Sequence, residues 1–196
     1  MLYCEINIMA LPRQNSINLI NKTFSYIFRV QPLSLKGYYN LLQGFATWVS
    51  DGSGGGGGTF DCHLKDGSIV RSWDGFLFYA RPRTSDLYAI CCEEIYELEN
   101  WFKLHAMGAV VDVGAYIGTY TVRATHTADL VIAIEPLPIN YKALQIGIKM
   151  NDRRLRADII TINKAVAETK GKTYIYLPIE SKCIDTEIAK IEGIPK

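Results

Sequence analysis

An aspartate, two glycines and a glutamate stand at a spacing that could bind a small polar ligand. Asp112, Gly114 and Gly118 follow one another as D-x-G-x-x-x-G, and Glu135 stands 21 residues after Gly114. A glycine lets the backbone approach a ligand where a Cβ would collide, and an ionised carboxylate can accept two hydrogen bonds from a sugar diol. Asp112 adds a negative charge that could pair with an ammonium group. The pattern therefore predicts a ligand with both a diol and a cation.

Two short apolar runs must position these residues. Residues 109–113 (AVVDV) and 130–134 (LVIAI) are typical of parallel strands buried on both faces of a sheet. Residues 119–125 between them predict a helix. Because the carboxyl ends of parallel strands meet at one edge of a sheet, we expect the glycine turn and Glu135 to lie side by side there.

The alternation of strand, turn and helix continues along the chain. Pro138 fits the first turn of a helix whose apolar side chains recur through Ile148. Residues 158–162 and 173–177 predict two further β segments. Repeated β-α-β units indicate an α/β fold with a Rossmann-like parallel sheet and right-handed crossovers.

The glycine spacing distinguishes between two nucleotide ligands. The turn reads G-x-x-x-G instead of the G-x-G-x-x-G that binds dinucleotides, and Tyr116 stands where a glycine would face a pyrophosphate. Asp112 would also repel that anion. S-adenosylmethionine has a diol and an ammonium group but no pyrophosphate, so it fits better than NAD. Two alternatives stay open: an NAD-dependent oxidoreductase, and a purely structural turn with Glu135 as a solvated strand end.

Three segments resemble the FkbM-type class I methyltransferases. They are VVDVGAYIGTYT at 110–121, IEPLP at 134–138 and NKAV at 163–166, within a likeness over about residues 94–178. The resemblance implies a class I methyltransferase core that transfers a methyl group from S-adenosylmethionine, usually to a hydroxyl oxygen of a sugar or secondary metabolite. The expected partner is a small-molecule or glycan methyl acceptor. The alternative is a non-catalytic fragment that binds the cofactor or a partner.

By the same likeness, a set of residues along the sheet edge would bind S-adenosylmethionine. From the methionine end to the adenine, the set consists of Asp112, Gly114, Tyr116, Gly118, Tyr120, Glu135 on the ribose, and Asn163 and Ala165 beside the adenine. Gly118 is also expected to let strand and helix approach closely.

No catalytic base and no metal site follow from the sequence. His105 precedes the first parallel strand and His126 follows the first helix, so both are expected at the amino edge, opposite the cofactor. His63 lies on an expected hairpin. Surface or packing roles are favoured for all three, although histidine is the usual general base.

The family continues with an Ile-Asp-x-Glu-Gly strand beside the first strand of its seven-stranded sheet. Here Ile184-Asp185-Thr186 resembles the lead-in to that strand, and the sequence reaches Lys196 soon after it. We therefore expect an incomplete parallel sheet. Strand 109–113 would be an unpaired edge, a liability unless a partner or the N-terminal zone covers it.

Three zones are expected along the chain. They are residues 1–58, an N-terminal helical extension with a glycine-rich loop; 59–106, an accessory β-hairpin and helix region; and 107–196, the Rossmann-like cofactor-binding core. In the first zone, apolar stripes at 17–28 and 38–49 predict amphipathic helices, with Pro32 between them. Five consecutive glycines, 54–58, predict a flexible loop.

The accessory zone is expected to begin with a hairpin. Residues 59–64 would pair with 68–71 through an Asp66-Gly67 turn. A β run at 76–80 follows, and Ser85 could cap the helix after it.

The amino-acid composition excludes several other classes of protein. The chain has 196 residues, of which 48% are hydrophobic and 21% charged, as in globular domains. A net charge of +1 lacks the basic excess of an extended nucleic-acid surface. Five scattered cysteines indicate reduced thiols, the N-terminus lacks signal-peptide features, and no apolar run is long enough to span a bilayer. We expect a cytoplasmic protein of open oligomeric state.

Overall fold

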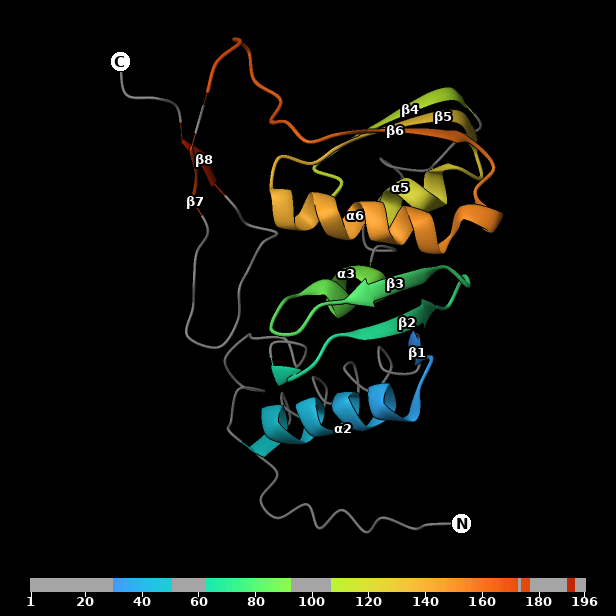
Figure 1. The fold of residues 1–196 in the computed structure, drawn as a ribbon, viewed down its shortest axis with the longest axis vertical. Helices are drawn as coiled ribbons and strands as arrows, with labels where there is room; N and C mark the ends of the chain where they lie inside the picture. The colour runs from blue at the N-terminus through green and yellow to red at the C-terminus, as the bar shows by residue number, and fades with distance from the viewer. Residues whose placement is uncertain (1–29, 51–62, 93–106, 173, 177–189, 193–196) are drawn as a thin grey trace, which may run out of the picture.

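The computed structural model describes residues 30–50, 63–92, 107–172, 174–176 and 190–192. Their secondary structure forms two main units, an antiparallel sheet with its helices and a parallel sheet with its helices (Figure 1). The predicted helix at 17–28, the glycine loop at 54–58 and the continuation toward residue 186 lie outside the described residues.

The antiparallel unit combines segments from the first two expected zones. Its sheet has the order β1-β2-β3 and is accompanied by two helices; the elements are β1 (Val30–Pro32), α2 (Leu35–Ser50), β2 (Ser68–Ser72), β3 (Leu77–Ala80) and α3 (Asp86–Cys92). The helix predicted over 38–49 is confirmed as α2, which buries Leu41 and Trp48. Because β1 pairs with β2, the chain on both sides of residue 58 contributes to one sheet.

The predicted hairpin through Asp66-Gly67 is wrong in its pairing. β2 pairs with β3 through the turn that contains Asp74-Gly75, and with β1 on its other side. Residues 59–62 lie outside the described part, and 63–67 form no strand. The side chain of Asn40 on α2 binds the 65–66 backbone instead, accepting from the N–H groups of Lys65 and Asp66 at 3.2 and 3.3 Å.

The parallel unit follows the predicted alternation of elements. Its strands have the order β4-β5-β6; the elements are β4 (Met107–Val113), α5 (Thr119–Ala124), β5 (Ala128–Ile134), α6 (Pro138–Met150) and β6 (Asp158–Ile162). Pro138 occupies the first turn of α6, as predicted. The segment predicted at 173–177 forms β7 (Tyr174–Tyr176), which pairs antiparallel with β8 (Lys190–Glu192).

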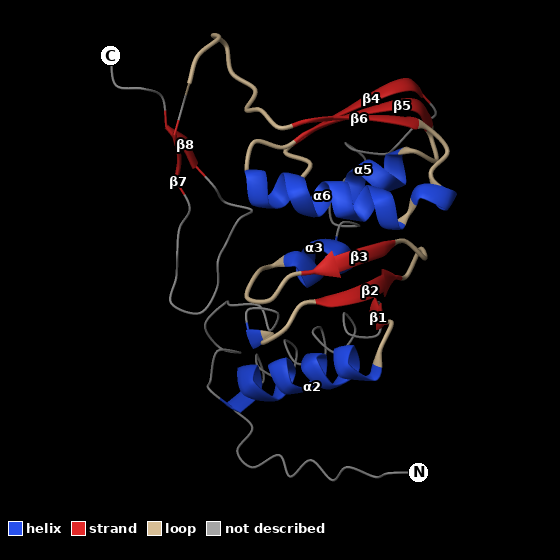
Figure 2. Ribbon diagram, viewed as in Figure 1, coloured by secondary structure: helices blue, strands red, loops and turns tan. Residues whose placement is uncertain are grey.

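One face of the parallel sheet differs from the expectation of burial on both faces. Among the described residues, α5 and α6 lie on a single side of the sheet (Figure 2). On the other side, Val111 and Val113 are 56% and 60% exposed. Within this part of the chain β4 pairs only with β5, so β4 is the predicted edge strand, and the antiparallel unit does not cover it.

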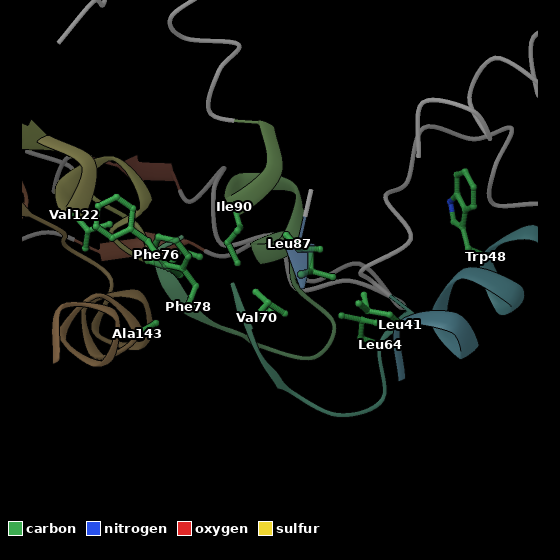
Figure 3. Packing of buried hydrophobic residues seen from close by; sticks show 13 residues of the cluster. Leu41, Trp48, Leu64, Val70, Phe76, Phe78, Leu87, Ile90, Val122 and Ala143 are labelled. Atoms are coloured by element: carbon green, nitrogen blue, oxygen red, sulfur yellow. The ribbon is translucent and has the colours of Figure 1, made fainter. Parts of the chain in front are cut away.

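The two units pack through one hydrophobic core. In Figure 1 the layers follow each other as α2, the β1–β3 sheet, α5 with α6, and the parallel sheet. The largest buried cluster runs through the first three layers, from Leu41 and Trp48 through Phe78 to Val122 and Ala143 (Figure 3). Among the described helices, none is long and apolar enough to cross a membrane.

Candidate functional site

The loop that joins β4 to α5 bends tightly against the end of β5. The backbone N–H groups of Gly114 and Ala115 both donate to the carbonyl of Ile134, at 2.8 and 3.0 Å. Gly118 closes the bend by donating to the carbonyl of Ala115 at 2.7 Å. The bend therefore sits at the carboxyl edge of the parallel sheet, where open α/β folds bind their ligands.

The two glycines of the bend have different surroundings. Both have positive φ, 84° at Gly114 and 86° at Gly118, which side chains tolerate poorly. A Cβ on Gly114 would meet no described atom within 4 Å, so its backbone faces open space. A Cβ on Gly118 would lie 2.5 Å from Cδ1 of Leu144 on α6. Gly114 leaves room for a ligand, whereas Gly118 allows close packing of the bend on a helix.

Glu135 lies beside this bend, as its spacing predicts. Its Oε2 accepts the backbone N–H of Tyr116 at 2.9 Å, and its Oε1 accepts that of Leu137 at 2.9 Å. The side-chain amide of Asn140 donates to Oε1 at 3.4 Å. The carboxylate therefore ties the glycine bend to the start of α6.

These contacts limit what Glu135 can still accept. A carboxylate has about four acceptor positions, and three are occupied by described groups. The residue is only 4% exposed. Burial raises the pKa of the carboxyl, while the two backbone N–H groups, Asn140 and the charge of Arg81 oppose that rise. One acceptor position, on Oε2, has no described donor, so Glu135 has room for at most one of the two hydrogen bonds to a diol that the sequence predicts.

Asp112 is the residue before the last in β4, and its side chain is directed toward α5. Its Oδ2 accepts the hydroxyl of Thr121 at 2.5 Å. Burial raises the pKa of the Asp112 carboxyl, and the hydrogen bond from Thr121 works against that rise. A half-buried carboxylate with a single described hydrogen bond could accept a cationic group from a ligand.

The two predicted tyrosines lie on either side of Gly118. Tyr116 has a left-handed backbone with φ of 54°, and its hydroxyl donates to Asp86 at 2.6 Å. The guanidinium of Arg81 lies 5.4 Å from the centre of its ring. The Tyr116 side chain is thus directed toward the antiparallel unit and away from Gly114. Tyr120 is half-buried on α5, and its contact with a ligand stays a prediction.

Asn163 and Ala165 follow β6 at the same sheet edge. The amide of Asn163 donates to the backbone carbonyls of Glu135 and Pro136, at 2.8 and 3.1 Å. Asn163 therefore fixes the loop after β5, and Ala165 is half-buried beside it. Their predicted place beside an adenine is compatible with this position and stays a prediction.

The histidines that the structure describes lie away from the bend. His126 follows α5 and so stands at the amino edge, where its ring packs edge-on against Phe76 at 5.2 Å. His63 lies before β2 in the antiparallel unit, and His105 is outside the described residues. Within the described chain, no cluster of three metal-binding side chains is present.

Sequence reasoning missed three residues that reach this site. Arg81 and Asp86 form a buried ion pair at 2.7 Å, and Asn140 accepts from Arg81 at 2.9 Å. Arg81 and Asp86 connect to Glu135 and Tyr116 from far along the chain, without any local pattern, whereas Asn140 stands five residues after Glu135. An arginine followed five residues later by an aspartate, across a turn and before a helix, was the only available signal.

Comparison of the chain with known protein families, curated proteins and solved structures finds no match. The functional argument therefore rests on the fold, on the geometry of the bend and on the sequence resemblance described above.

Proposed function

We propose that the chain binds S-adenosylmethionine at the Gly114 bend and belongs to a methyltransferase. The observation that carries this proposal is the open backbone of Gly114 beside a carboxylate at the carboxyl edge of a parallel sheet. Such an edge, with a side-chain-poor bend, is where α/β folds admit nucleotide-like ligands.

The charges near the bend suit a ligand with an ammonium group. Asp112 and Glu135 lie at the ends of adjacent strands, and no described cation forms an ion pair with either. A pyrophosphate would meet two carboxylates here, which disfavours NAD. Asp112 would hold the ammonium group, and the free position on Glu135 Oε2 would hold one ribose hydroxyl.

Methyl transfer from a sulfonium is an in-line displacement, so alignment supplies much of the rate. In this proposal the chain's residues bind and orient the cofactor, and the acceptor is a hydroxyl of a small molecule or glycan. The acceptor class rests on the resemblance of residues 110–121, 134–138 and 163–166 to the FkbM-type enzymes.

One observation favours a second candidate, a non-catalytic module of the same fold. Glu135 is almost fully buried and three of its acceptor positions are already used. In this candidate the carboxylate holds the bend and the start of α6 together, and its remaining acceptor position binds no ligand. If such a module serves only as a partner-binding fragment, the wild-type chain would bind no cofactor.

A matched pair of glycine variants tests the proposal. Gly114→Ala places a methyl group in the open space, while Gly75→Ala introduces similar backbone strain at φ of 91° in the β2–β3 turn, where its Cβ would also lie 2.9 Å from the end of the flexible Arg154 side chain. Each should cost roughly 1–2 kcal/mol of stability. In calorimetric titrations with S-adenosylmethionine, Gly114→Ala should bind at least about tenfold more weakly than wild type, and Gly75→Ala should bind equally well.

Two results would contradict the proposal. Absence of binding by wild type would favour the non-catalytic module, and equal binding by Gly114→Ala would remove the ligand from the bend. Titration with NAD is the third arm, because heat from NAD alone would indicate an oxidoreductase. Turnover is measured separately, as release of S-adenosylhomocysteine with candidate hydroxyl acceptors.

A further inference from the structure

Five residues form a closed hydrogen-bond circuit between the two units, here named the Arg81 circuit. The guanidinium of Arg81 donates to both carboxylate oxygens of Asp86 at 2.7 Å and to Asn140 at 2.9 Å. Asn140 donates to Glu135, Glu135 accepts from the backbone of Tyr116, and the Tyr116 hydroxyl returns to Asp86.

The Arg81 circuit buries charged side chains at a place where apolar side chains could also pack. Arg81 is 8% exposed, Glu135 4%, Asn140 1% and Asp86 0%. Burying charged groups is expensive unless each finds partners, and replacing a buried ion pair by apolar side chains is often neutral or stabilising. The cost suggests that these groups do something besides holding the units together.

One effect of the circuit is on the direction of Tyr116. This residue has φ of 54°, a conformation that costs about 1–3 kcal/mol in a non-glycine residue and persists only when its surroundings enforce it. The hydroxyl bond to Asp86 and the cation–π contact with Arg81 hold the ring on the antiparallel unit. The space beside Gly114 stays open as a result.

A second effect is on the charge of Glu135. The titratable groups joined to it in the circuit are Arg81 from the loop after β3, Asp86 from α3 and the phenol of Tyr116. Burial raises the pKa of Glu135, and the positive charge of Arg81 opposes that rise. The circuit therefore favours an ionised Glu135 beside the bend.

We infer that Arg81 and Asp86 are positioning residues of the cofactor site, which hold Tyr116 clear of Gly114 and Glu135 in place beside it. This inference rests on the proposed binding of S-adenosylmethionine. It makes the antiparallel unit part of the site, although none of its residues need touch the ligand.

A pair of single-hydroxyl deletions tests the direction of Tyr116. Tyr116→Phe removes the bond to Asp86 and leaves the Arg81–Asp86 ion pair intact. Tyr141→Phe is the matched control, because its half-buried hydroxyl binds Thr161 at 2.8 Å outside the circuit. Both variants should lose similar thermal stability. Only Tyr116→Phe should bind S-adenosylmethionine more weakly, by about tenfold.

A second pair of variants tests the effect of Arg81 on the charge of Glu135. Arg81→Met removes the cation of the circuit, and Arg123→Met removes a cation outside it, which forms an ion pair with Asp74 between the two units. Without Arg81, Glu135 should keep its proton to higher pH. When the affinity for S-adenosylmethionine is measured as a function of pH, the loss of affinity at acid pH should therefore begin at a higher pH in Arg81→Met. In Arg123→Met it should begin at the same pH as in wild type. If Arg81→Met does not fold, Tyr116→Phe and its control decide the question.

The outcomes separate this inference from the proposed function. Wild-type binding with equal affinity in Tyr116→Phe and Tyr141→Phe would overturn the inference and leave the proposed function standing. No binding by wild type would overturn both. A loss of affinity for S-adenosylmethionine that is confined to Tyr116→Phe supports both. If folded Arg81→Met loses affinity at the same acid pH as wild type, Arg81 does not control the charge of Glu135.

Discussion

At the scale of single residues, the two carboxylates of the site are stabilised in different ways. Glu135 accepts two backbone N–H groups and an amide, whereas Asp112 has one described hydrogen bond, from Thr121. Burial raises the pKa of both carboxyls. An acid whose pKa is raised by folding destabilises the folded state once it ionises. Asp112 therefore costs stability at neutral pH, as groups held ready for a ligand often do.

This cost predicts the behaviour of Asp112→Asn. The amide oxygen can still accept from Thr121, and the buried charge is gone. Because the folded state of wild type holds the Asp112 proton more tightly than the unfolded state, its contribution to stability falls as the pH rises through the acid range above roughly 4. Asp112→Asn should thus be more stable than wild type in urea unfolding at pH 7, and the difference should vanish at low pH.

The same variant should bind S-adenosylmethionine more weakly, because an amide cannot neutralise an ammonium group. Asp158→Asn is a suitable control, since Asp158 is exposed at the start of β6 and its neutralisation should change neither property. A stability gain for Asp112→Asn that persists unchanged to low pH would show that its origin is not the charge.

At the scale of elements, the parallel unit could be predicted well and the antiparallel unit only in part. Glycine and proline residues separate the strands and α-helices within residues 107–162, so each strand and α-helix there could be predicted, whereas the short 3-10 helix Asp152–Arg154 could not. The accessory zone, residues 59–106, has two Asp-Gly turn signals, at 66–67 and 74–75. Both are compatible with local pairing, and Asn40 on a distant helix decides against the first.

The start of α3 is a second place where a local sequence signal did not predict the contacts that form. Ser85 precedes α3 as predicted, but its buried hydroxyl has no partner within the described residues, and the N–H of Asp86 donates to Thr84 instead. The Arg81 circuit was beyond prediction, because Arg81 and Asn140 stand 59 residues apart and meet only when the units pack.

The contact between the bend and α6 allows a prediction at this scale. Gly118→Ala should cost about 2–4 kcal/mol, because it adds strain at φ of 86° to a clash with Leu144. In a Leu144→Ala background the clash disappears, so the added cost of Gly118→Ala should fall to about 1–2 kcal/mol. Urea unfolding of the four proteins gives the coupling, and strictly additive costs would show that the side chain of Leu144 is not the obstacle.

At the scale of the whole molecule, two sheets share one core and the parallel sheet has one covered face. The units are joined by polar contacts as well as by packing: Asn151 after α6 exchanges two hydrogen bonds of 2.8 Å with the backbone of Leu77, and Arg123 pairs with Asp74. The apolar run of β4 predicted a strand buried on both faces, but periodicity within a strand cannot show whether a second layer exists. That depends on elements elsewhere in the chain.

The one-sided sheet predicts opposite responses to the same substitution on adjacent strands. Val131 on β5 is 0% exposed beneath α5, while Val111 on β4 is 56% exposed on the other face. Valine and threonine have the same shape, so the exchange tests burial of a hydroxyl without creating a cavity. Val131→Thr should lower the free energy of unfolding by about 1–3 kcal/mol, since its hydroxyl enters an apolar cluster. Val111→Thr should change it by less than about 0.5 kcal/mol, because the new hydroxyl meets water. Urea unfolding of the two variants at neutral pH measures the difference, and a comparable loss at Val111 would mean that something covers this face in solution.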